Sequence, residues 1–213
     1  MEFTLGIITG GNSFDLLNEV FKSIQDQYID KSKFEVVIVG GEEVEGENVT
    51  HVPFDESSGK YTAKKNLITK FAKFENVVYL HDYMALCDGW YEGYVKFGND
   101  WDICMNVVEN SDGSRFRDWC AWDDPELCYP DGVHNIALPS YDYNKTHYMY
   151  ISGNYWVSKK RVMEEEPLNE DLDWGEAEDV EWSNRIRDKY QYVMNTHSKV
   201  KCLKDKKLSA RYV

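Results

Sequence analysis

The sequence predicts an α/β protein in which helices flank both faces of a parallel sheet. Strand-like and helix-like segments alternate over the first hundred residues, as expected for such a sheet. The apolar run at residues 76–80 ends abruptly before Asp82, as in a strand buried on both faces. The 213 residues, 42% hydrophobic and 15% aromatic, can bury a substantial core. We therefore expect a globular fold, with one domain over residues 1–213.

The first strand is expected at residues 3–9, and the chain leaves it through Thr9-Gly10-Gly11. Ser13 is the expected N-cap of a helix that runs to about residue 28. Its apolar residues recur at helical spacing on one face, which comprises Leu16, Leu17, Val20, Phe21 and Ile24.

Two more strands are expected, at residues 34–39 and 48–52, followed by a helix at residues 60–74. The predicted inward face of this helix comprises Ala63, Leu67, Ile68, Phe71 and Phe74. The strand that ends near Asp82 comes next. Open α/β sheets bind ligands at the carboxyl edge of their strands, so Asp82 is a candidate binding residue.

The second half of the chain has a weaker pattern. Strands are expected at residues 101–108, 148–152 and 192–195. A helical stretch is expected to open at Gly153, and another helix should run from near Glu176 to about residue 190. The long, aromatic and Asp-rich stretch at residues 110–146 has no clear period, which is typical of a functional lid or binding wall.

The charge and cysteine content exclude several classes of function. Acidic residues outnumber basic ones by 38 to 24, a net charge of −14, so we expect no nucleic-acid partner. An anionic small ligand remains possible where a metal ion and local lysines offset this charge. The five cysteines are odd in number and widely spaced, which favours reduced thiols over a zinc site or a disulfide frame.

Nothing in the sequence indicates a membrane. No apolar stretch is long enough to span a bilayer, and the N-terminus has no basic region before an apolar one. We therefore expect a cytoplasmic protein without a membrane span.

A second group of acids lies at Glu178-Asp179, at the expected start of a helix. Acids stabilise helix N-termini through the helix dipole, and Glu181 with Arg185 is an ordinary i,i+4 pair. A structural role therefore explains this group as well as a functional one does. The order of the two acidic sites, about a hundred residues apart with an aromatic stretch between them, favours function.

This order resembles the GT-A fold glycosyltransferases, which use nucleotide-sugar donors, and looks closest to the compact enzymes of chloroviruses. The resemblance implies a single GT-A domain with a mixed, mostly parallel sheet. Residues 1–100 would form its nucleotide-binding half and residues 101–213 its acceptor-binding half. The family's Asp-X-Asp motif is reduced here to His81-Asp82-Tyr83, and its usual aspartate after the second strand is replaced by Gly40-Gly41.

The resemblance also implies roles for individual residues. Metal ligands would be Asp82 and His197, holding Mn²⁺ or Mg²⁺ as a Lewis acid at the departing diphosphate. Residues expected to bind the nucleotide-sugar are Thr9, Gly10, Gly11, Asp55, Lys64, Lys65, Asn66, His81 and Tyr83. Asp179 would deprotonate the acceptor hydroxyl and Glu178 would fix it, if the enzyme inverts the anomeric carbon. In a retaining enzyme these acids would stabilise an oxocarbenium-like species or bind the acceptor.

The expected substrates are a UDP-sugar, with UDP-glucose as first trial or a deoxyhexose donor, and a glycan or glycoprotein acceptor. If the chain is viral, it would act in the host cytoplasm on viral glycoprotein glycans. Aromatic side chains that could stack on sugars are Trp119, Trp122, Trp156, Trp174 and Tyr83.

Other functions remain open or are excluded by missing motifs. A sugar nucleotidyltransferase shares the layout but should carry a basic, glycine-rich loop where this chain has residues 12–15. A glycan-binding module with structural Ca²⁺ is the non-enzymatic alternative. Neither a dinucleotide-binding G-x-G-x-x-G nor a P-loop motif occurs after the first strand.

Overall fold

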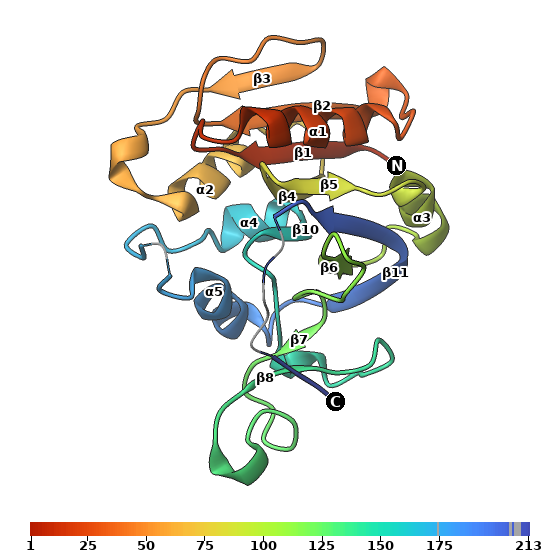
Figure 1. Ribbon diagram of the computed structural model, residues 1–213, viewed down its shortest axis with the longest axis vertical. Coiled ribbons are helices and arrows are strands. Elements are labelled where there is room, and N and C mark those ends of the chain that lie inside the picture. Colours follow the sequence, from red (N-terminus) through yellow and green to blue (C-terminus); the bar gives the residue numbers. More distant parts are fainter. Residues whose placement is uncertain (174, 205, 207–209) are drawn as a thin grey trace.

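The computed structural model describes residues 1–173, 175–204, 206 and 210–213. It confirms the predicted α/β class: an eight-stranded mixed sheet carries helices on both faces, and a four-stranded sheet lies at one end (Figure 1). The order of the main sheet is β3-β2-β1-β4-β10-β6-β11-β5. Its strands are β1 (Phe3–Ile8), β2 (Phe34–Val39), β3 (Val49–Val52), β4 (Asn76–His81), β5 (Met84–Leu86), β6 (Ile103–Glu109), β10 (Tyr155–Lys159) and β11 (Tyr192–Cys202).

The smaller sheet and the helices complete the fold. The smaller sheet contains β7 (Cys120–Ala121), β8 (Ile136–Leu138), β9 (Met149–Tyr150) and β12 (Ala210–Tyr212). The α-helices are α1 (Phe14–Gln25), α2 (Tyr61–Phe71), α3 (Trp90–Phe97), α4 (Lys160–Glu165) and α5 (Glu178–Ile186). Short 3-10 helices occur at Lys31–Lys33, Glu56–Ser58, Pro130–Gly132 and Thr146–Tyr148. None of the helices in the described part of the chain is long and apolar enough to cross a membrane.

The central strands are parallel, and their register positions the site. Strand β1 pairs in parallel with β2 and with β4, so that Ile8 lies beside His81. The chain segments that follow β1 and β4 therefore emerge together at the carboxyl edge. Strand β10 then joins β4 in antiparallel orientation, which makes the sheet mixed.

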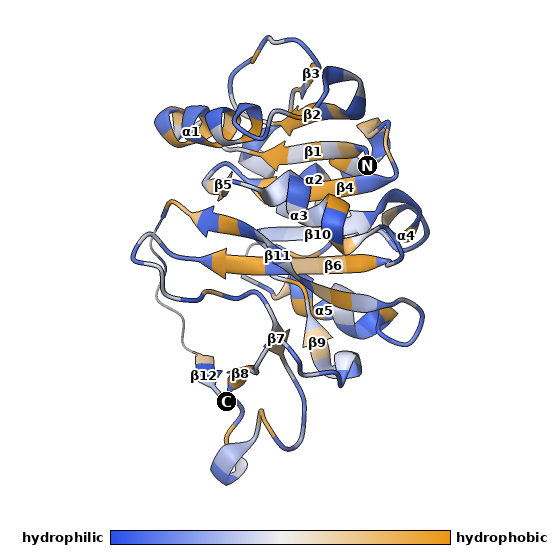
Figure 2. Ribbon diagram, turned by 90° about the vertical axis from the view of Figure 1, so that its right-hand side faces the viewer, coloured by the Kyte–Doolittle hydropathy of each residue, from blue (hydrophilic) through white to orange (hydrophobic). Residues whose placement is uncertain are grey.

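Two hydrophobic layers cover the sheet because successive strand residues point to opposite faces. In β1, Phe3, Leu5 and Ile7 pack with α1 and α3, whereas Ile8 belongs to the layer formed with α2, α4 and α5. Figure 2 shows hydrophobic residues concentrated along β1, β2, β4 and β6. Strands buried on both faces explain the continuous apolar runs in the sequence.

The predicted inward face of α2 is wrong in part. The helix buries Ile68 as expected, but it also buries Lys64 and Lys65, whereas Phe71 is 42% exposed. The two lysines can be buried because their ammonium groups are bonded to carbonyl and carboxylate oxygens, which a count of apolar residues does not reveal.

Three further expectations differ from the structure in the second half. Gly153 opens no helix; it precedes strand β10, and helix α4 begins only at Lys160. The stretch at residues 110–146 contains β7 and β8 of the smaller sheet. The last predicted strand, 192–195, extends to Cys202 because a register shift between Asn195 and Lys199 interrupts its pattern without ending its pairing with β6.

Candidate functional site

Asp82 is tied to the end of β1 at the carboxyl edge of the sheet. Its Oδ2 accepts a hydrogen bond of 2.8 Å from the hydroxyl of Thr9, and its N–H donates to the carbonyl of Ile8. The Thr9 hydroxyl also accepts from the N–H of Gly11, at 3.1 Å. The Asp82 side chain is therefore fixed at the sheet edge, and its Oδ1 has no hydrogen-bond donor among the described residues.

Lys64 of α2 joins the ends of β1 and β2. Its Nζ donates to the carbonyl of Thr9 at 2.6 Å and to both oxygens of Glu56, at 2.7 and 2.6 Å. Glu56 Oε1 also accepts from the N–H of Gly41, at 3.1 Å. A carboxylate therefore does reach the end of β2, although the sequence motif there is Gly40-Gly41.

Asp55, which the sequence suggested for that position, has a local role instead. Its Oδ1 accepts from the N–H and the hydroxyl of Ser57, at 3.0 and 2.6 Å, and so caps the short helix Glu56–Ser58. These bonds lower the pKa of the exposed Asp55 carboxyl. The structure directs its neighbour Glu56, rather than Asp55, towards Lys64.

The backbone of Gly153 connects three elements across the site. Its carbonyl accepts from Lys65 Nζ at 2.7 Å and from His81 Nε2 at 3.1 Å, while its N–H donates to Asp179 Oδ2 at 3.0 Å. A side chain here would crowd the acids, because a Cβ would lie 3.0 Å from Glu178 Oε1 and 3.1 Å from Asp179 Oδ2. Residue 153 must therefore be small for α5 to approach β10 this closely.

The two acids at the start of α5 differ in their surroundings. Glu178 pairs with the buried Lys65, at 3.1 Å between Oε1 and Nζ. Asp179 is buried, and its Oδ1 accepts from the N–H of Val180 at 2.9 Å. Burial raises the pKa of Asp179, and the charge of Glu178 adds to this, whereas Lys65 opposes it. The Asp179 carboxylate is thus more basic than that of an ordinary surface aspartate, which suits a proton acceptor.

His81 is neutral at physiological pH. Burial lowers its pKa well below the usual 6.5, and the positive charges of Lys65 and Lys206 lower it further. With the Gly153 carbonyl as the partner of Nε2, the proton lies on Nε2 and Nδ1 is a free acceptor. The ring stacks on Tyr61, with 6.1 Å between centroids.

A cleft with a volume of about 480 Å³ lies between the edge of the main sheet and the smaller sheet. His81, Tyr83, Glu178 and Asp179 line it directly. Other residues that line it are Tyr61, Phe116, Arg117, Trp122, Tyr150 and Lys206. Of the aromatics considered for sugar stacking, Tyr83 and Trp122 line the cleft, Trp119 and Trp156 are buried in the core, and Trp174 lies outside the described residues.

The other predicted site residues do not line this cleft: Thr9, Gly10, Gly11, Asp55, Lys64, Lys65, Asn66, Asp82 and His197. The amide of Asn66 bonds to the backbone of Leu168 and to Glu170, so it holds the segment after α4. The backbone of His197 packs against Gly93 of α3. Leu203, six residues later, donates its N–H to the carbonyl of Tyr83, so these contacts place His197 at α3 and not beside Asp82.

The protein's own metal ligands are therefore few. In the described part of the chain, no three His, Cys, Asp or Glu side chains are grouped so that they could hold an ion together. At the sheet edge, Glu56 is occupied by Lys64 and the N–H of Gly41, whereas Asp82 has one carboxylate oxygen without a donor among the described residues. Such a donor set fits Mg²⁺ or Mn²⁺ that arrives with phosphate oxygens, because these ions are commonly held by one or two carboxylates plus substrate phosphates.

Sequence reasoning missed Gly153, Glu56, Arg117 and Lys206. Gly153 carries a weak signal, since Ser152-Gly153-Asn154 is a turn sequence directly before a strand. The other three have no pattern in the sequence that sets them apart from surface charges. Their positions come from contacts between segments distant along the chain.

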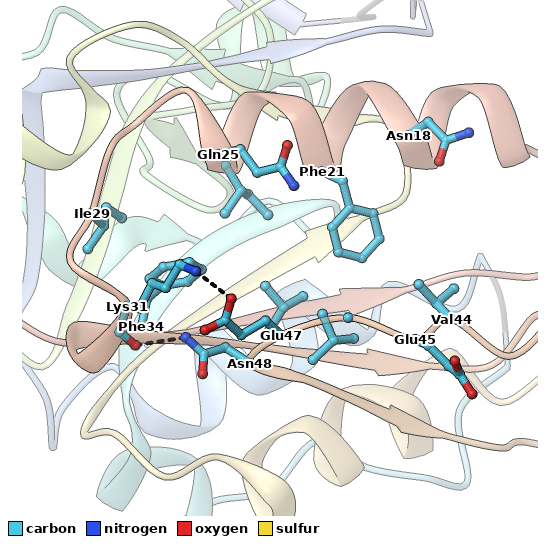
Figure 3. A pocket seen from close by; sticks show the side chains of 14 residues that line it. Asn18, Phe21, Gln25, Ile29, Lys31, Phe34, Val44, Glu45, Glu47 and Asn48 are labelled. Atoms are coloured by element: carbon cyan, nitrogen blue, oxygen red, sulfur yellow. Dashed lines mark hydrogen bonds and ion pairs between the residues drawn. The ribbon is translucent and has the colours of Figure 1, made fainter.

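A second cavity, of about 550 Å³, lies away from these residues between α1, β2 and β3. Figure 3 shows its mainly apolar interior, with Phe21, Ile29, Phe34 and Val44 facing it, and the ion pair between Lys31 and Glu47 at one end. None of the predicted site residues lines this groove.

Comparison with known proteins supports the fold. No family model and no curated protein matches the sequence. Among solved structures, S. aureus TarS 1-349 in complex with UDP-GlcNAc is similar, with a TM-score of 0.68 at 15% identity over 98% of this chain. GalNAc-T7 with UDP, GalNAc and Mn²⁺ gives a TM-score of 0.68 at 12% identity over 95% of this chain.

The chain spans only 60% of that TarS chain and 44% of the GalNAc-T7 chain. A complex of S. aureus TarS 1-349 with UDP is equally similar, with a TM-score of 0.67 at 14% identity, over 94% of this chain and 60% of that one. Together with the strand order and the mixed sheet, these similarities show that the protein has the GT-A fold.

Proposed function

We propose that this protein is a glycosyltransferase that moves a hexose or deoxyhexose from a UDP-sugar to a hydroxyl group of a glycan or glycoprotein. The observation that carries the proposal is the position of Asp82 beside the cleft. Asp82 is fixed at the carboxyl edge of the sheet, and its chain neighbours His81 and Tyr83 line the cleft together with Glu178 and Asp179. Structural neighbours of this fold have been solved with UDP or UDP-GlcNAc, which supports a nucleotide-sugar donor.

The donor nucleoside is proposed to bind at Thr9, Gly10 and Gly11. Glu56, held by Lys64 and by the N–H of Gly41, supplies a carboxylate there in place of Asp55. Carbonyl and carboxylate oxygens at this edge can accept the N–H groups of a base.

The donor diphosphate is proposed to lie against Asp82, which would hold Mn²⁺ or Mg²⁺ together with phosphate oxygens. When bound, the ion would supply Lewis-acid stabilisation of the negative charge that develops on the leaving group. The structurally similar GalNAc-T7 has been solved with UDP, GalNAc and Mn²⁺, which supports a divalent ion. The neutral His81 and the adjacent Tyr83 would border the sugar, since both line the cleft.

Asp179 is proposed to accept the proton of the acceptor hydroxyl. The hydroxyl oxygen then forms a bond to the anomeric carbon, the bond from that carbon to the diphosphate oxygen breaks, and UDP leaves with the electron pair. Glu178, oriented by Lys65, accepts a hydrogen bond from the acceptor or the sugar. This sequence applies to inversion; in a retaining enzyme the same acids would bind the acceptor, and the anomeric configuration of the product distinguishes the two.

The cleft aromatics suit a carbohydrate acceptor. Trp122 lines the cleft from the stretch between β7 and β8 and packs against His134, with 4.6 Å between ring centroids. Aromatic faces of this kind stack on sugar rings. We also propose that the donor is UDP-glucose or a UDP-deoxyhexose and that the protein acts in the cytoplasm in viral glycan synthesis.

The test is turnover of nucleotide-sugars. The protein is incubated with Mn²⁺, a panel of UDP-sugars that includes UDP-glucose and UDP-GlcNAc, and a glycan mixture, and release of UDP is measured. The proposal expects UDP release from at least one donor, with a glycosylated product. Pyrophosphate release from UTP and a sugar phosphate would indicate a nucleotidyltransferase instead. Glycan binding without any affinity for nucleotides would contradict an enzymatic role.

A further inference from the structure

Two lysines, Lys204 and Lys206, lie beside Tyr83, the residue that follows Asp82, and Arg117 lines the same cleft as Lys206. We propose that Arg117 and Lys206 bind the diphosphate of the donor and neutralise the charge of the UDP leaving group. This inference rests on the proposed function and names residues that no sequence motif of the site contains.

Lys206 is held in place at the cleft wall. Its Nζ donates to the hydroxyl of Tyr83 at 2.6 Å and lies 4.4 Å from the centroid of that ring. Its backbone N–H and carbonyl are both bonded to the side-chain amide of Asn110, at 3.3 Å each. A lysine anchored at both its backbone and its ammonium group is positioned for a ligand at lower entropic cost than a free surface lysine.

Arg117 has an unused buried donor. Its Nε is buried and has no hydrogen-bond partner among the described residues, although the side chain lines the cleft. The adjacent acid, Asp118, is paired with Arg115 instead, at 2.6 Å. A buried guanidinium nitrogen without a partner is costly, so a bound anion that accepts from it would relieve this cost.

The two cations lie near Asp82. Arg117 and Lys206 line the same cleft as Tyr83, the residue next to Asp82 in the chain. Tyr83 links Lys206 to Asp82 along the chain. A ligand at this point would meet one carboxylate, which can hold a cation, and two cations, which can bind phosphate oxygens directly.

Lys204 connects this place to the expected nucleoside site. Its Nζ donates to the hydroxyl of Ser13 at 2.9 Å, four residues after Thr9. The same Nζ lies 4.9 Å from the centroid of the Tyr83 ring. A cation therefore lies between the loop after β1 and the cleft, where a diphosphate would extend from a nucleoside at Thr9.

The overall charge makes this cation pair distinctive. The chain has a net charge of −14, so a dianionic diphosphate approaches against a repulsive field. The guanidinium group of Arg117 and the ammonium group of Lys206, within a partly buried cleft, offset that field locally. Hydrogen bonds from charged donors to phosphate are also among the stronger hydrogen bonds in proteins.

The experiment is calorimetric titration of UDP and, separately, of uridine into the wild-type protein and into Arg117→Met and Lys206→Met. Both titrations are repeated with Mn²⁺ and with EDTA. We expect each variant to bind UDP at least roughly 10-fold more weakly, as the loss of a charge-assisted hydrogen bond implies, with unchanged uridine affinity. Arg117→Lys should lose less than Arg117→Met, because it keeps the charge but not the planar fork.

Lys199→Met is the matched control. Lys199 lies on β11, is 44% exposed, pairs with Glu109 and does not line the cleft, so its loss changes the net charge equally without touching the cleft. UDP affinity within twofold of wild type is expected for it. Circular dichroism and thermal unfolding establish that each variant is folded before its affinity is compared.

Three outcomes overturn the inference, and they are distinguishable. If the wild-type protein binds UDP but both methionine variants bind it equally well, the cation pair does not contact the diphosphate, and the proposed function stands. Retained UDP affinity together with weakened binding of an acidic glycan would assign the pair to an anionic acceptor. If the wild-type protein has no affinity for UDP, the proposed function itself fails.

Discussion

The cleft beside Asp82 and the groove between α1, β2 and β3 are of similar size but differ in chemistry. The cleft, of about 480 Å³, is lined by two carboxylates, a lysine, an arginine and a neutral histidine, and hydrogen bonds fix Asp179, His81 and Lys206 in position. The groove, of about 550 Å³, is mainly apolar inside, and its Lys31–Glu47 ion pair is about 70% exposed at both side chains. Cavity volume therefore does not identify the functional site here; convergence of buried titratable groups does.

The difference arises from α2. Two consecutive lysines of this helix are buried, and each reaches a different part of the site. Lys64 bonds to Thr9 and Glu56 on the nucleotide side, and Lys65 bonds to Gly153 and Glu178 on the acceptor side. Burial of two ammonium groups is tolerated only because both are fully engaged, and the helix thereby fixes the relative positions of the two halves of the cleft.

The largest expected effect separates the acceptor acids from the donor site. In Asp179→Asn, the side-chain oxygen can still accept the hydrogen bond from the N–H of Gly153, but the proton acceptor is lost. The rate of sugar transfer should therefore fall by about 10²–10⁴-fold. Affinity for UDP should remain within twofold of wild type. Asp188→Asn, at a position whose side chain is 81% exposed, is the control and should transfer normally. Near-normal turnover of Asp179→Asn, measured by UDP release, would remove this residue from the mechanism.

The second effect is on pH dependence. Asp179 accepts a proton only when ionised, so activity should rise with pH along a limb at its pKa, which burial places above the ordinary carboxyl value. Lys65→Met removes a charge that lowers this pKa and should move the limb to higher pH. Glu178→Gln removes a charge that raises it and should move the limb to lower pH.

Lys70→Met, an exposed position on the same helix, is the control for Lys65→Met and should leave the limb unchanged. The measurement is kcat/KM against pH for all four proteins. Shifts of the limb in the same direction for Lys65→Met and Glu178→Gln would show that Asp179 is not the titrating group.

The groove should show the opposite behaviour from the cleft. Phe21→Ala removes part of its apolar wall and should lower the free energy of unfolding by roughly 1–3 kcal/mol, because Phe21 packs against the core. UDP affinity should not change. A loss of UDP affinity without a loss of stability would assign the nucleotide to the groove and break the distinction between the two cavities.

The parts of the fold that could be predicted are those determined by local apolar patterns. Strands buried on both faces carry apolar runs, such as residues 36–39 of β2, and the predicted bounds of β1 and β2 agree with the structure to within one residue. The face of α2 could not be placed, because Lys65 is buried by a partner, Glu178, that lies 113 residues away. Patterns of hydrophobicity contain no information about such pairs.

The candidate site shows the same division. Asp82 and the Glu178-Asp179 pair could be proposed from their order along the chain and their expected places at a strand end and a helix start. Gly153 could not be proposed from the sequence, because it acts through its backbone. The position of His197 away from the cleft could not be predicted either, because it depends on a register shift in β11. Side-chain chemistry is visible in a sequence, whereas backbone hydrogen bonds and register are not.

We propose that Asp82, at the sheet edge beside the cleft, receives the diphosphate of a UDP-sugar together with a divalent ion. The decisive measurement is calorimetric titration of UDP into the wild-type protein and into Asp82→Ala, each with Mn²⁺ and with EDTA. We expect Mn²⁺ to strengthen UDP binding to the wild-type protein and this gain to be lost in Asp82→Ala, which remains folded. Equal affinities of the two proteins for UDP in the presence of Mn²⁺ would show that Asp82 does not take part in donor binding.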